Sequence, residues 1–319
     1  MFYLLQMDIK MKNNVVNMRS VAVTGASGLI GDLIVKDLFD AGWKVKVLTR
    51  SDRKHFSPKI TVIQSDINND EGLRRLLDGV DAIFHCAAEL SDTKKMYSTN
   101  VEGTRKLINL AANTKASFFC HLSSAGVIGA TSVSYVTEDT TCNPKNLYEK
   151  TKYESELLVA NANLDMRICI LRPTNVFSST KFGSILSLPI NNSWKDIIKV
   201  HLKGKENAHI VYAKDVANAA LFFLVNNVPD VNIYFVSYDY DVNNTVAGIY
   251  NLYQSLCHKK NHIRFTLPNY IPYLLRKIFR GGSLHGGVIF SSDKLKKEGF
   301  VFEYGVRSSL EEICRIRGK

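Results

Sequence analysis

The sequence contains no apolar run long enough to cross a membrane. A membrane-spanning helix needs about 18 consecutive apolar residues, and no stretch of these 319 residues reaches that length. The first residues also lack the order of basic, apolar and small residues that is typical of a cleaved secretory signal. We therefore expect a cytoplasmic protein without stable membrane insertion.

Paired cysteines of the kind that hold metals are also missing. The six cysteines stand at positions 86, 120, 142, 169, 257 and 314, without a CxxC pair and without histidines at ligand spacing. We expect reduced thiols, several of them in strands, and no metal site.

The chain has no dense basic tract, although its formal net charge is +11. Lys and Arg are spread along the sequence without aromatic residues between them, which argues against nucleic acid as a partner. A basic surface also suits an anionic small molecule. Segment 267–282 is basic and amphipathic, which is typical either of a helix on a membrane surface or of a helix packed on the protein.

What the sequence does contain is a glycine-rich turn between a strand pattern and a helix pattern. Residues 21–31 read VAVTGASGLIG, and Ser27, Leu29 and Ile30 stand among the glycines. Gly25 permits a tight turn, Gly28 lets phosphates approach the main chain, and Gly31 lets the helix pack on the strand. A helix that begins near Gly28 directs its free N–H groups at an anion. We predict a dinucleotide pyrophosphate site; the alternative is a tight turn without a ligand.

Strand and helix patterns alternate along most of the chain. The predicted strands lie near 45–48, 60–63, 82–85, 118–122 and 167–171, and long helices are predicted at 93–113 and 146–162. This alternation predicts an α/β fold with a doubly wound parallel sheet. Beyond Pro173 the alternation loosens, which indicates a smaller C-terminal substrate lobe. The predicted parts are a tail or extended start at 1–17, a dinucleotide-binding domain mainly at 18–175, and the lobe mainly at 176–319, with 207–236 returning to the core.

Tyr148 and Lys152 lie four residues apart in a predicted helix and therefore on one face. An ammonium group beside a phenol favours the phenolate and lowers the tyrosine pKa from about 10. Such a tyrosine can exchange a proton with a substrate alcohol. A surface pair without a chemical role is the alternative.

Several ordered motifs between residues 19 and 224 resemble those of the extended short-chain dehydrogenases/reductases, in the NAD-dependent epimerase/dehydratase family. The motifs are TGASGLIG at 24–31, DI at 66–67, HCAA at 85–88, NVEGT at 100–104, LSSAGVIG at 122–129, the Tyr148/Lys152 pair, LRPTNVF at 171–177 and VYAKDVA at 211–217. The resemblance implies a Rossmann fold, and a homodimer formed through the helices at 93–113 and 146–162.

The resemblance also implies a role for individual residues. Ser124 would polarise the substrate oxygen, Tyr148 would transfer the proton, and Lys152 would lower the pKa of Tyr148 and hold the nicotinamide ribose. Asn100 would support a water relay to Lys152. The remaining positions that match the family are Asp66 and Ile67 at the adenine, Ala87 and Ala88 beside the adenine and ribose, Pro173 at the cofactor, and Asn175 at a nucleotide-sugar ligand.

The end of the second predicted strand bears on the choice of cofactor. NAD-binding folds usually carry an acidic residue there, whereas this chain has Arg50. An arginine can pair with a 2′-phosphate through charge-assisted hydrogen bonds. NADP is therefore favoured over NAD, unless a shift of the loop presents Asp52 to the ribose.

The residues after Ser124 bear on the reaction. Ala125 and Gly126 stand where 4,6-dehydratases of the family carry an acid, and Ile128 stands where the family often has Tyr. We expect an NAD(P)-dependent oxidoreductase acting on a nucleotide-sugar, by 4-keto reduction or C4 epimerisation, in the biosynthesis of a surface polysaccharide. The alternatives are a steroid-, flavonol- or aldehyde-type dehydrogenase of the same superfamily, and an NADP-binding sensor or scaffold without turnover.

Overall fold

The structure is a computed structural model that describes residues 19–50, 56–226, 231–259, 262–268, 270 and 285–317. The predicted tail at 1–17, Asp52 and most of segment 267–282 lie outside the described residues. The described chain divides into two compact units, and each is presented by itself. The first unit comprises residues up to 127, then 145–172 and 216–234, and the second comprises 128–144, 173–215 and 235–319.

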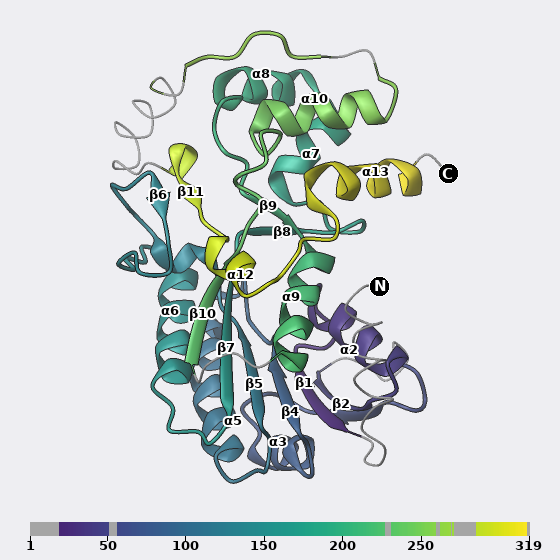
Figure 1. Cartoon of the computed structure of the whole chain (residues 1–319), viewed down its shortest axis with the longest axis vertical. Coiled ribbons are helices and arrows are strands. Elements are labelled where there is room, and N and C mark those ends of the chain that lie inside the picture. Colours follow the sequence, from purple (N-terminus) through teal and green to yellow (C-terminus); the bar gives the residue numbers. More distant parts are fainter. Residues whose placement is uncertain are drawn as a thin grey trace. The chain divides into compact units, whose positions relative to one another are not determined.

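A seven-stranded sheet is the centre of the first unit (Figure 1). Its strands are β1 (Ser20–Thr24), β2 (Lys44–Thr49), β3 (Thr61–Gln64), β4 (Ala82–His85), β5 (Phe118–Leu122), β7 (Arg167–Pro173) and β10 (Val231–Val236). They lie side by side in the order β10-β7-β5-β4-β1-β2-β3, so the direction of winding reverses between β1 and β4. β1 pairs in parallel with both β2 and β4. The predicted doubly wound parallel sheet is confirmed.

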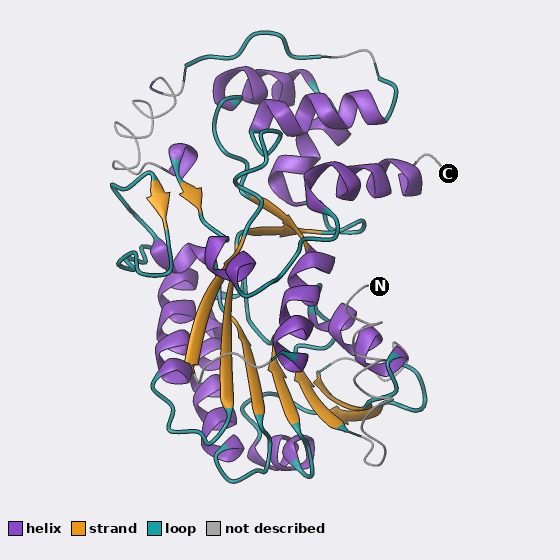
Figure 2. Ribbon diagram, in the orientation of Figure 1, coloured by secondary structure: helices purple, strands orange, loops and turns teal. Residues whose placement is uncertain are grey.

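The strands of this sheet are apolar on both faces because helices cover both sides of it. All five residues of β1 and all five of β5 are buried, as is typical of parallel strands between two helical layers. Figure 2 shows helices on the two sides of the strands. Leu73 and Leu107, from two helices, pack in one core cluster with the strand residues Ile83, Phe119 and Ile168.

Among the described residues, helices of the first unit follow the strands in sequence. They are α2 (Gly31–Asp40), α3 (Asp70–Leu77), α4 (Thr93–Tyr97), α5 (Gly103–Ala111), α6 (Leu147–Ala160) and the larger part of α9 (Ala213–Val225). The predicted helix at 93–113 is divided, because a π-helical turn, η2 (Ser98–Glu102), separates α4 from α5. π-helical turns often occur at functional sites, and this one carries Asn100.

The second unit is built from short strands and helices. It holds β6 (Tyr135–Val136), β8 (Asn175–Phe177), α7 (Gly183–Asn191), α8 (Trp194–Lys203), β9 (Ile210–Tyr212), α10 (Val246–Leu256), β11 (Ile289–Phe290), α12 (Asp293–Lys297) and α13 (Gly305–Arg317). β8 pairs with β9 and β11 with β6, both in parallel. Leu188, Val200, Val246 and Tyr250 form the core cluster between α7, α8 and α10.

Within the residues that the structure describes, no helix combines the length and apolar character needed to span a bilayer. The same residues contain no group of three or more His, Cys, Asp or Glu side chains arranged to hold a metal ion.

The prediction of six reduced cysteines is wrong for two of them. Cys257, at the C-terminal end of α10, and Cys314, in α13, form a disulfide with their Cα atoms 5.6 Å apart. These positions are separated by 57 residues, and they meet because α10 packs on α13. Cys86, Cys120, Cys142 and Cys169 are free thiols.

We expect Cys257→Ser to lower the free energy of unfolding by up to about 4 kcal/mol, because the disulfide closes a loop of 57 residues and restricts the unfolded chain. Denaturant unfolding measures this loss, and Cys142→Ser, which removes a free thiol, is the matched control. Titration of the unfolded, unreduced protein should find only the four free thiols. Six titratable thiols, with equal stability of the two variants, would contradict the disulfide.

Candidate active site

Two glycines of the turn after β1 are required by the packing of the protein itself. Gly25 has a φ of +66°, and a Cβ atom there would lie 2.5 Å from the backbone nitrogen of Ala87. A Cβ atom on Gly31 would lie 2.3 Å from the carbonyl oxygen of Gly25. Gly25 therefore lets the ends of β1 and β4 meet, and Gly31 lets α2 begin directly against the turn.

The middle glycine has a different environment. Ser27 and Gly28 form the exposed tip of the turn, and a Cβ atom on Gly28 would lie 3.0 Å from the Gly25 carbonyl oxygen. α2 begins at Gly31 rather than near Gly28, after Ile30, whose apolar side chain cannot satisfy the first N–H groups of the helix. In contrast, an asparagine side chain caps α3 and another caps α6. The helix start, which no side chain caps, and the exposed Gly28 fit a dinucleotide pyrophosphate.

The N-terminal cap of α6 positions the predicted catalytic pair. The Asn146 side chain accepts the N–H of Glu149 at 2.9 Å, and the Glu149 carboxylate accepts the N–H of Asn146 at 3.3 Å. This capping box fixes the start of the helix. Tyr148 therefore lies in the first turn, and Lys152 lies one turn later on the same face.

Tyr148 and Ser124 come together at the carboxyl end of β5. The Ser124 hydroxyl lies near enough to the Tyr148 phenol to affect its pKa, and the Ser124 oxygen accepts the N–H of Gly126 at 3.1 Å. Burial raises the pKa of Tyr148, an effect that the Ser124 hydroxyl partly offsets. The phenol is therefore protonated at neutral pH and can act as a proton donor.

Lys152 is buried, and its ammonium group donates to the carbonyl oxygen of Leu122 at 2.6 Å. Burial lowers the pKa of Lys152 to about 8, so the group is mostly charged at neutral pH. The predicted lowering of the Tyr148 pKa by Lys152 is not found, because burial dominates at the phenol and the ammonium is engaged by Leu122.

The two serines after β5 have separate partners. Ser123 is buried and donates to the Glu156 carboxylate at 2.6 Å. Glu156 also accepts two hydrogen bonds from Arg172, at 2.6 and 3.0 Å, with both side chains almost fully buried. Ser123 therefore belongs to a structural network, and only Ser124 faces Tyr148.

Asn100 holds the loop after β4. Its carbonyl oxygen accepts the N–H of Glu89 at 2.7 Å, and its amide donates to the Glu89 carbonyl oxygen at 3.0 Å and to the Thr151 hydroxyl at 3.1 Å. Its own backbone carbonyl accepts the Thr104 hydroxyl at 2.6 Å. These contacts give Asn100 a positioning role; the water relay to Lys152 stays a prediction.

The predicted adenine-side residues follow β3 and β4. Asp66 accepts the backbone and side-chain N–H groups of Asn68 at 2.9 and 3.1 Å, and Ile67 is buried in the core. Ala87 donates its N–H to the Thr24 hydroxyl at 3.3 Å, and Ala88 follows it. All four lie at the carboxyl ends of strands, where doubly wound sheets bind ligands.

Glu89 is a candidate that sequence reasoning missed. One of its carboxylate oxygens accepts the N–H groups of the next three residues, each at 3.1 Å, and these bonds lower the pKa of Glu89. The other oxygen lies 3.9 Å from the guanidinium of Arg50. The Glu89 side chain is 15% exposed and that of Arg50 is 59% exposed. At the end of β2 the sequence has Arg50 in place of an acidic residue. The loop after β4 therefore supplies the acidic side chain there, that of Glu89.

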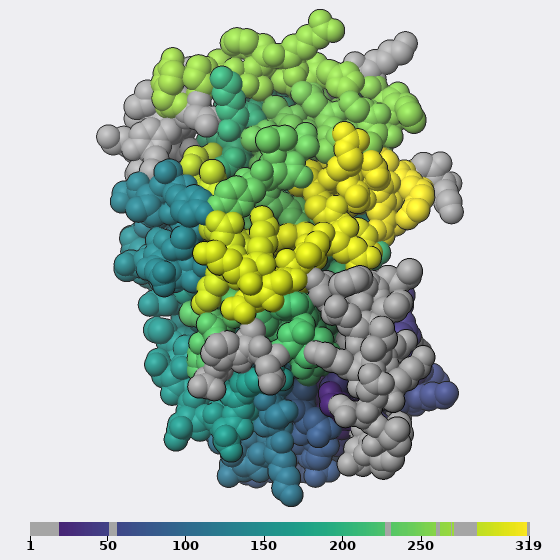
Figure 3. All heavy atoms as spheres, in the orientation of Figure 1, coloured from purple at the N-terminus to yellow at the C-terminus, as the bar shows by residue number. Residues whose placement is uncertain are grey.

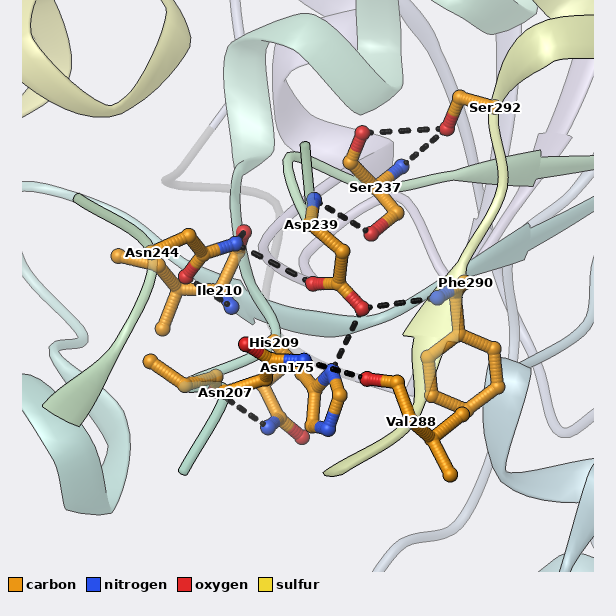
Figure 4. Close-up of polar contacts among 11 residues, drawn as sticks. Asn175, Asn207, His209, Ile210, Ser237, Asp239, Asn244, Val288, Phe290 and Ser292 are labelled. Carbon is orange, nitrogen blue, oxygen red and sulfur yellow. Dashed lines mark hydrogen bonds and ion pairs between the residues drawn. The ribbon is translucent and has the colours of Figure 1, made fainter. Parts of the chain in front are cut away.

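Asn175 and Pro173 lie in the second unit. The Asn175 amide donates to the Ala208 carbonyl oxygen at 3.2 Å, and its N–H donates to the His209 carbonyl oxygen at 2.7 Å. Figure 4 shows His209 beside the buried Asp239 carboxylate, 2.6 Å from the His209 Nδ1 atom. Pro173 is buried at the end of β7. Their predicted contacts with ligands stay predictions.

A model of a known protein family matches a large part of the chain. Residues 21–236 match the model of the NAD dependent epimerase/dehydratase family. The chain belongs to this family. The match includes the glycine turn, Ser124, Tyr148 and Lys152, so the resemblance read from the motifs is confirmed.

Curated relatives of this family differ in their reactions. The chain is 31% identical over 179 residues to a decarboxylating sterol-4-alpha-carboxylate 3-dehydrogenase of Dictyostelium discoideum, covering 51% of this chain and 55% of the relative. It is also 31% identical over 178 residues to a UDP-glucose 4-epimerase of Lactobacillus helveticus, covering 52% of this chain and 54% of the relative. The matches thus span about half the length of these relatives.

A solved structure shows the same fold over almost the whole chain. It is a short-chain dehydrogenase/reductase superfamily protein from Agrobacterium tumefaciens with bound NAD. The TM-score is 0.73 at 20% sequence identity, and the alignment covers 94% of this chain and 97% of that one.

We expect Lys152→Met to unfold less readily than the wild type at pH 7, by up to roughly 3 kcal/mol. The pKa of Lys152 is about 8 when folded and about 10.5 when exposed, so the unfolded chain binds more protons between these values. Wild-type stability should therefore gain with pH across this window relative to the variant. Urea unfolding at both ends of this pH window measures the difference in the free energy of unfolding between the variant and the wild type.

The matched control is Lys150→Met, which changes an exposed lysine on the same helix. Its free energy of unfolding should differ little from that of the wild type at every pH. If the difference in the free energy of unfolding between Lys152→Met and the wild type stays constant across the pH window, the charge of Lys152 is not destabilised by burial.

Proposed function

We propose that the chain is an NAD(P)-dependent oxidoreductase that interconverts an alcohol and a ketone at Ser124, Tyr148 and Lys152. The observation that carries the proposal is the proximity of the Ser124 hydroxyl to the Tyr148 phenol at the carboxyl end of β5, one helical turn from the buried Lys152. The glycine turn after β1, in the same unit, supplies a fitting site for a dinucleotide.

Each residue of the trio has a distinct task in this chemistry. A bound nicotinamide supplies or accepts the hydride. The Ser124 hydroxyl binds the substrate oxygen, and the protonated Tyr148 donates its proton to that oxygen as a carbonyl becomes an alcohol. The charged Lys152, which has further N–H groups beside the one donated to the Leu122 carbonyl oxygen, would hold the nicotinamide ribose.

We propose a nucleotide-sugar as substrate, converted by 4-keto reduction or C4 epimerisation, with surface polysaccharide synthesis as its use. The 31% identity to a UDP-glucose 4-epimerase supports this class. A sterol or steroid is the second candidate, because the identity to a sterol-4-alpha-carboxylate 3-dehydrogenase is equally high. The complete Ser124, Tyr148 and Lys152 set favours both candidates over a sensor or scaffold without turnover.

Turnover with defined probes tests the reaction. We expect the protein to act on one of two probes. The first is a UDP-sugar, either by oxidation of NADPH or NADH with its 4-keto form or by interconversion of its C4 epimers without net oxidation of the nucleotide. The second, if the second candidate holds, is a 3-ketosteroid, with oxidation of NADPH or NADH. Tyr148→Phe should lower the rate by about 10²–10⁴-fold, because it removes the proton donor, and should leave nucleotide affinity unchanged. Tyr153→Phe, on the same helix, is the matched control. Failure of both probes, or full activity of Tyr148→Phe, would refute the proposal.

We propose NADP as the favoured cofactor, with Arg50 as the residue that binds the 2′-phosphate. The nearby Glu89 carboxylate attracts the same guanidinium and repels a phosphate, so it weakens this preference. Cofactor choice then depends on the balance between these two side chains.

Arg50→Ala should weaken NADPH binding by about ten-fold or more and leave NADH binding nearly unchanged, because it removes a charge-assisted hydrogen bond. Glu89→Gln should strengthen NADPH binding while keeping an oxygen for the three N–H groups that it accepts. Nucleotide fluorescence titrations measure both affinities. Glu102→Gln, in the exposed pair with Arg105, is the control. Equal effects of Arg50→Ala on the two nucleotides would remove Arg50 as the selector.

A homodimer through the helices at 93–113, which are α4, η2 and α5, and at 146–162, which is α6, is part of the proposal, as is a cytoplasmic location, and both stay predictions. In a reducing cytoplasm, Cys257 and Cys314 would exist as thiols. The redox state of this pair in freshly isolated protein therefore bears on the compartment.

A further inference from the structure

Helix α8 in the second unit has two unlike faces. Val200 is buried in the cluster with α7 and α10, and Asp196 is buried beside it. Trp194, Ile198 and Leu202, spaced four residues apart, are 69%, 47% and 37% exposed. Residues at this spacing form one stripe along a helix. Trp194, Ile198 and Leu202 thus face solvent on one side of α8.

A basic stripe runs beside the apolar one. Lys195, Lys199 and Lys203 each follow a member of the apolar stripe and are exposed. The Lys195 ammonium lies 5.5 Å from the centre of the Trp194 ring. Lys199 contacts Asp196 at 3.2 Å, yet its side chain stays 59% exposed. The charge of this surface is therefore positive.

The coil after α10 extends this surface. The carbonyl oxygen of Phe265 lies 2.6 Å from His201 Nδ1, and the N–H of Leu267 donates to the His201 carbonyl oxygen at 2.9 Å. Gly204 makes room for Thr266, which a Cβ atom there would meet at 2.2 Å. So anchored, the coil leaves Phe265 68% exposed. Figure 1 shows it passing along α8 and α10, and Figure 3 shows it in light green at the surface.

We propose that this surface, the α8 face, binds the surface of an anionic lipid bilayer. The α8 face comprises Trp194, Ile198, Leu202, Phe265, Lys195, Lys199 and Lys203. Tryptophan and phenylalanine rings insert at the level of lipid headgroups, and lysine stems lie along apolar surface while their ammonium groups reach the phosphates. Apolar side chains flanked by one sign of charge match a surface that is apolar below and anionic above.

The protein carries its own reporter for this binding. It has two tryptophans, of which Trp43 is 4% exposed and Trp194 is 69% exposed. Vesicles of phosphatidylcholine and phosphatidylglycerol should shift the Trp194 emission to shorter wavelength and sediment the full-length protein. Vesicles of phosphatidylcholine alone should do so far less, and added salt should weaken binding to the anionic vesicles. Lipids that carry a quencher in the upper acyl chain should quench Trp194.

Two sets of variants separate charge from apolar contact. The triple variant Lys195→Glu, Lys199→Glu, Lys203→Glu should bind anionic vesicles at least about ten-fold more weakly. Its control, Lys59→Glu, Lys115→Glu, Lys297→Glu, changes the net charge equally at exposed lysines elsewhere and should bind almost as the wild type does. Ile198→Ser with Leu202→Ser should reduce the blue shift, whereas Val133→Ser with Val242→Ser, also at exposed positions, should not.

Three results would overturn the proposal. The first is the absence of any Trp194 shift with anionic vesicles at low salt. The second is equal weakening by the two lysine triples, which would mean attraction by net charge alone. The third is a concentration-dependent Trp194 shift without lipid, together with a change in oligomeric state by light scattering in Ile198→Ser/Leu202→Ser, which would make the α8 face an interface between copies of the chain.

Discussion

The geometry of the site depends on two charged side chains that α6 places in the interior. Lys152 and Glu156 are both almost fully buried, and an unpartnered buried charge would cost several kcal/mol. Lys152 has the Leu122 carbonyl oxygen, and Glu156 has Ser123 and Arg172. These bonds attach α6 to the ends of β5 and β7, so Tyr148, one turn earlier, is held beside Ser124. The helix cannot rotate or slide without breaking a buried charged contact.

The glycine turn and helix α6 both combine residues that fix the scaffold with residues that are proposed for binding or catalysis. Gly25 and Gly31 are dictated by contacts inside the protein, whereas Gly28 is exposed and leaves its surface to a ligand. On α6, Glu156 serves the interior and Tyr148 serves the site, with Lys152 between them. In both elements, residues that contact the protein interior alternate with residues that lie toward the proposed site.

Local patterns predict most of the first unit because its information is local. A β-branched run, a glycine turn and helical spacing follow one another within a few residues, and the predicted strands fall within a few residues of the observed ones. The Cys257–Cys314 bond lies beyond such reasoning, since it depends on the packing of α10 on α13. Glu89 was missed because its relation to Arg50 arises only when the ends of β2 and β4 are placed on one sheet. On α8, apolar spacing alone would turn Trp194, Ile198 and Leu202 inward, whereas Val200 holds that position.

The first unit is built from three separate stretches of chain, and this affects the order in which it can form during synthesis. Its sheet is completed by β10, so the first unit has all of its described strands only when residue 236 has left the ribosome. The glycine turn is among the earliest described residues to emerge. The last strand of its unit, β10, emerges much later. During that interval the edge of β7 has no neighbour on its outer side. Synthesis thus passes through a stage in which the glycine turn exists before the sheet of its unit is complete.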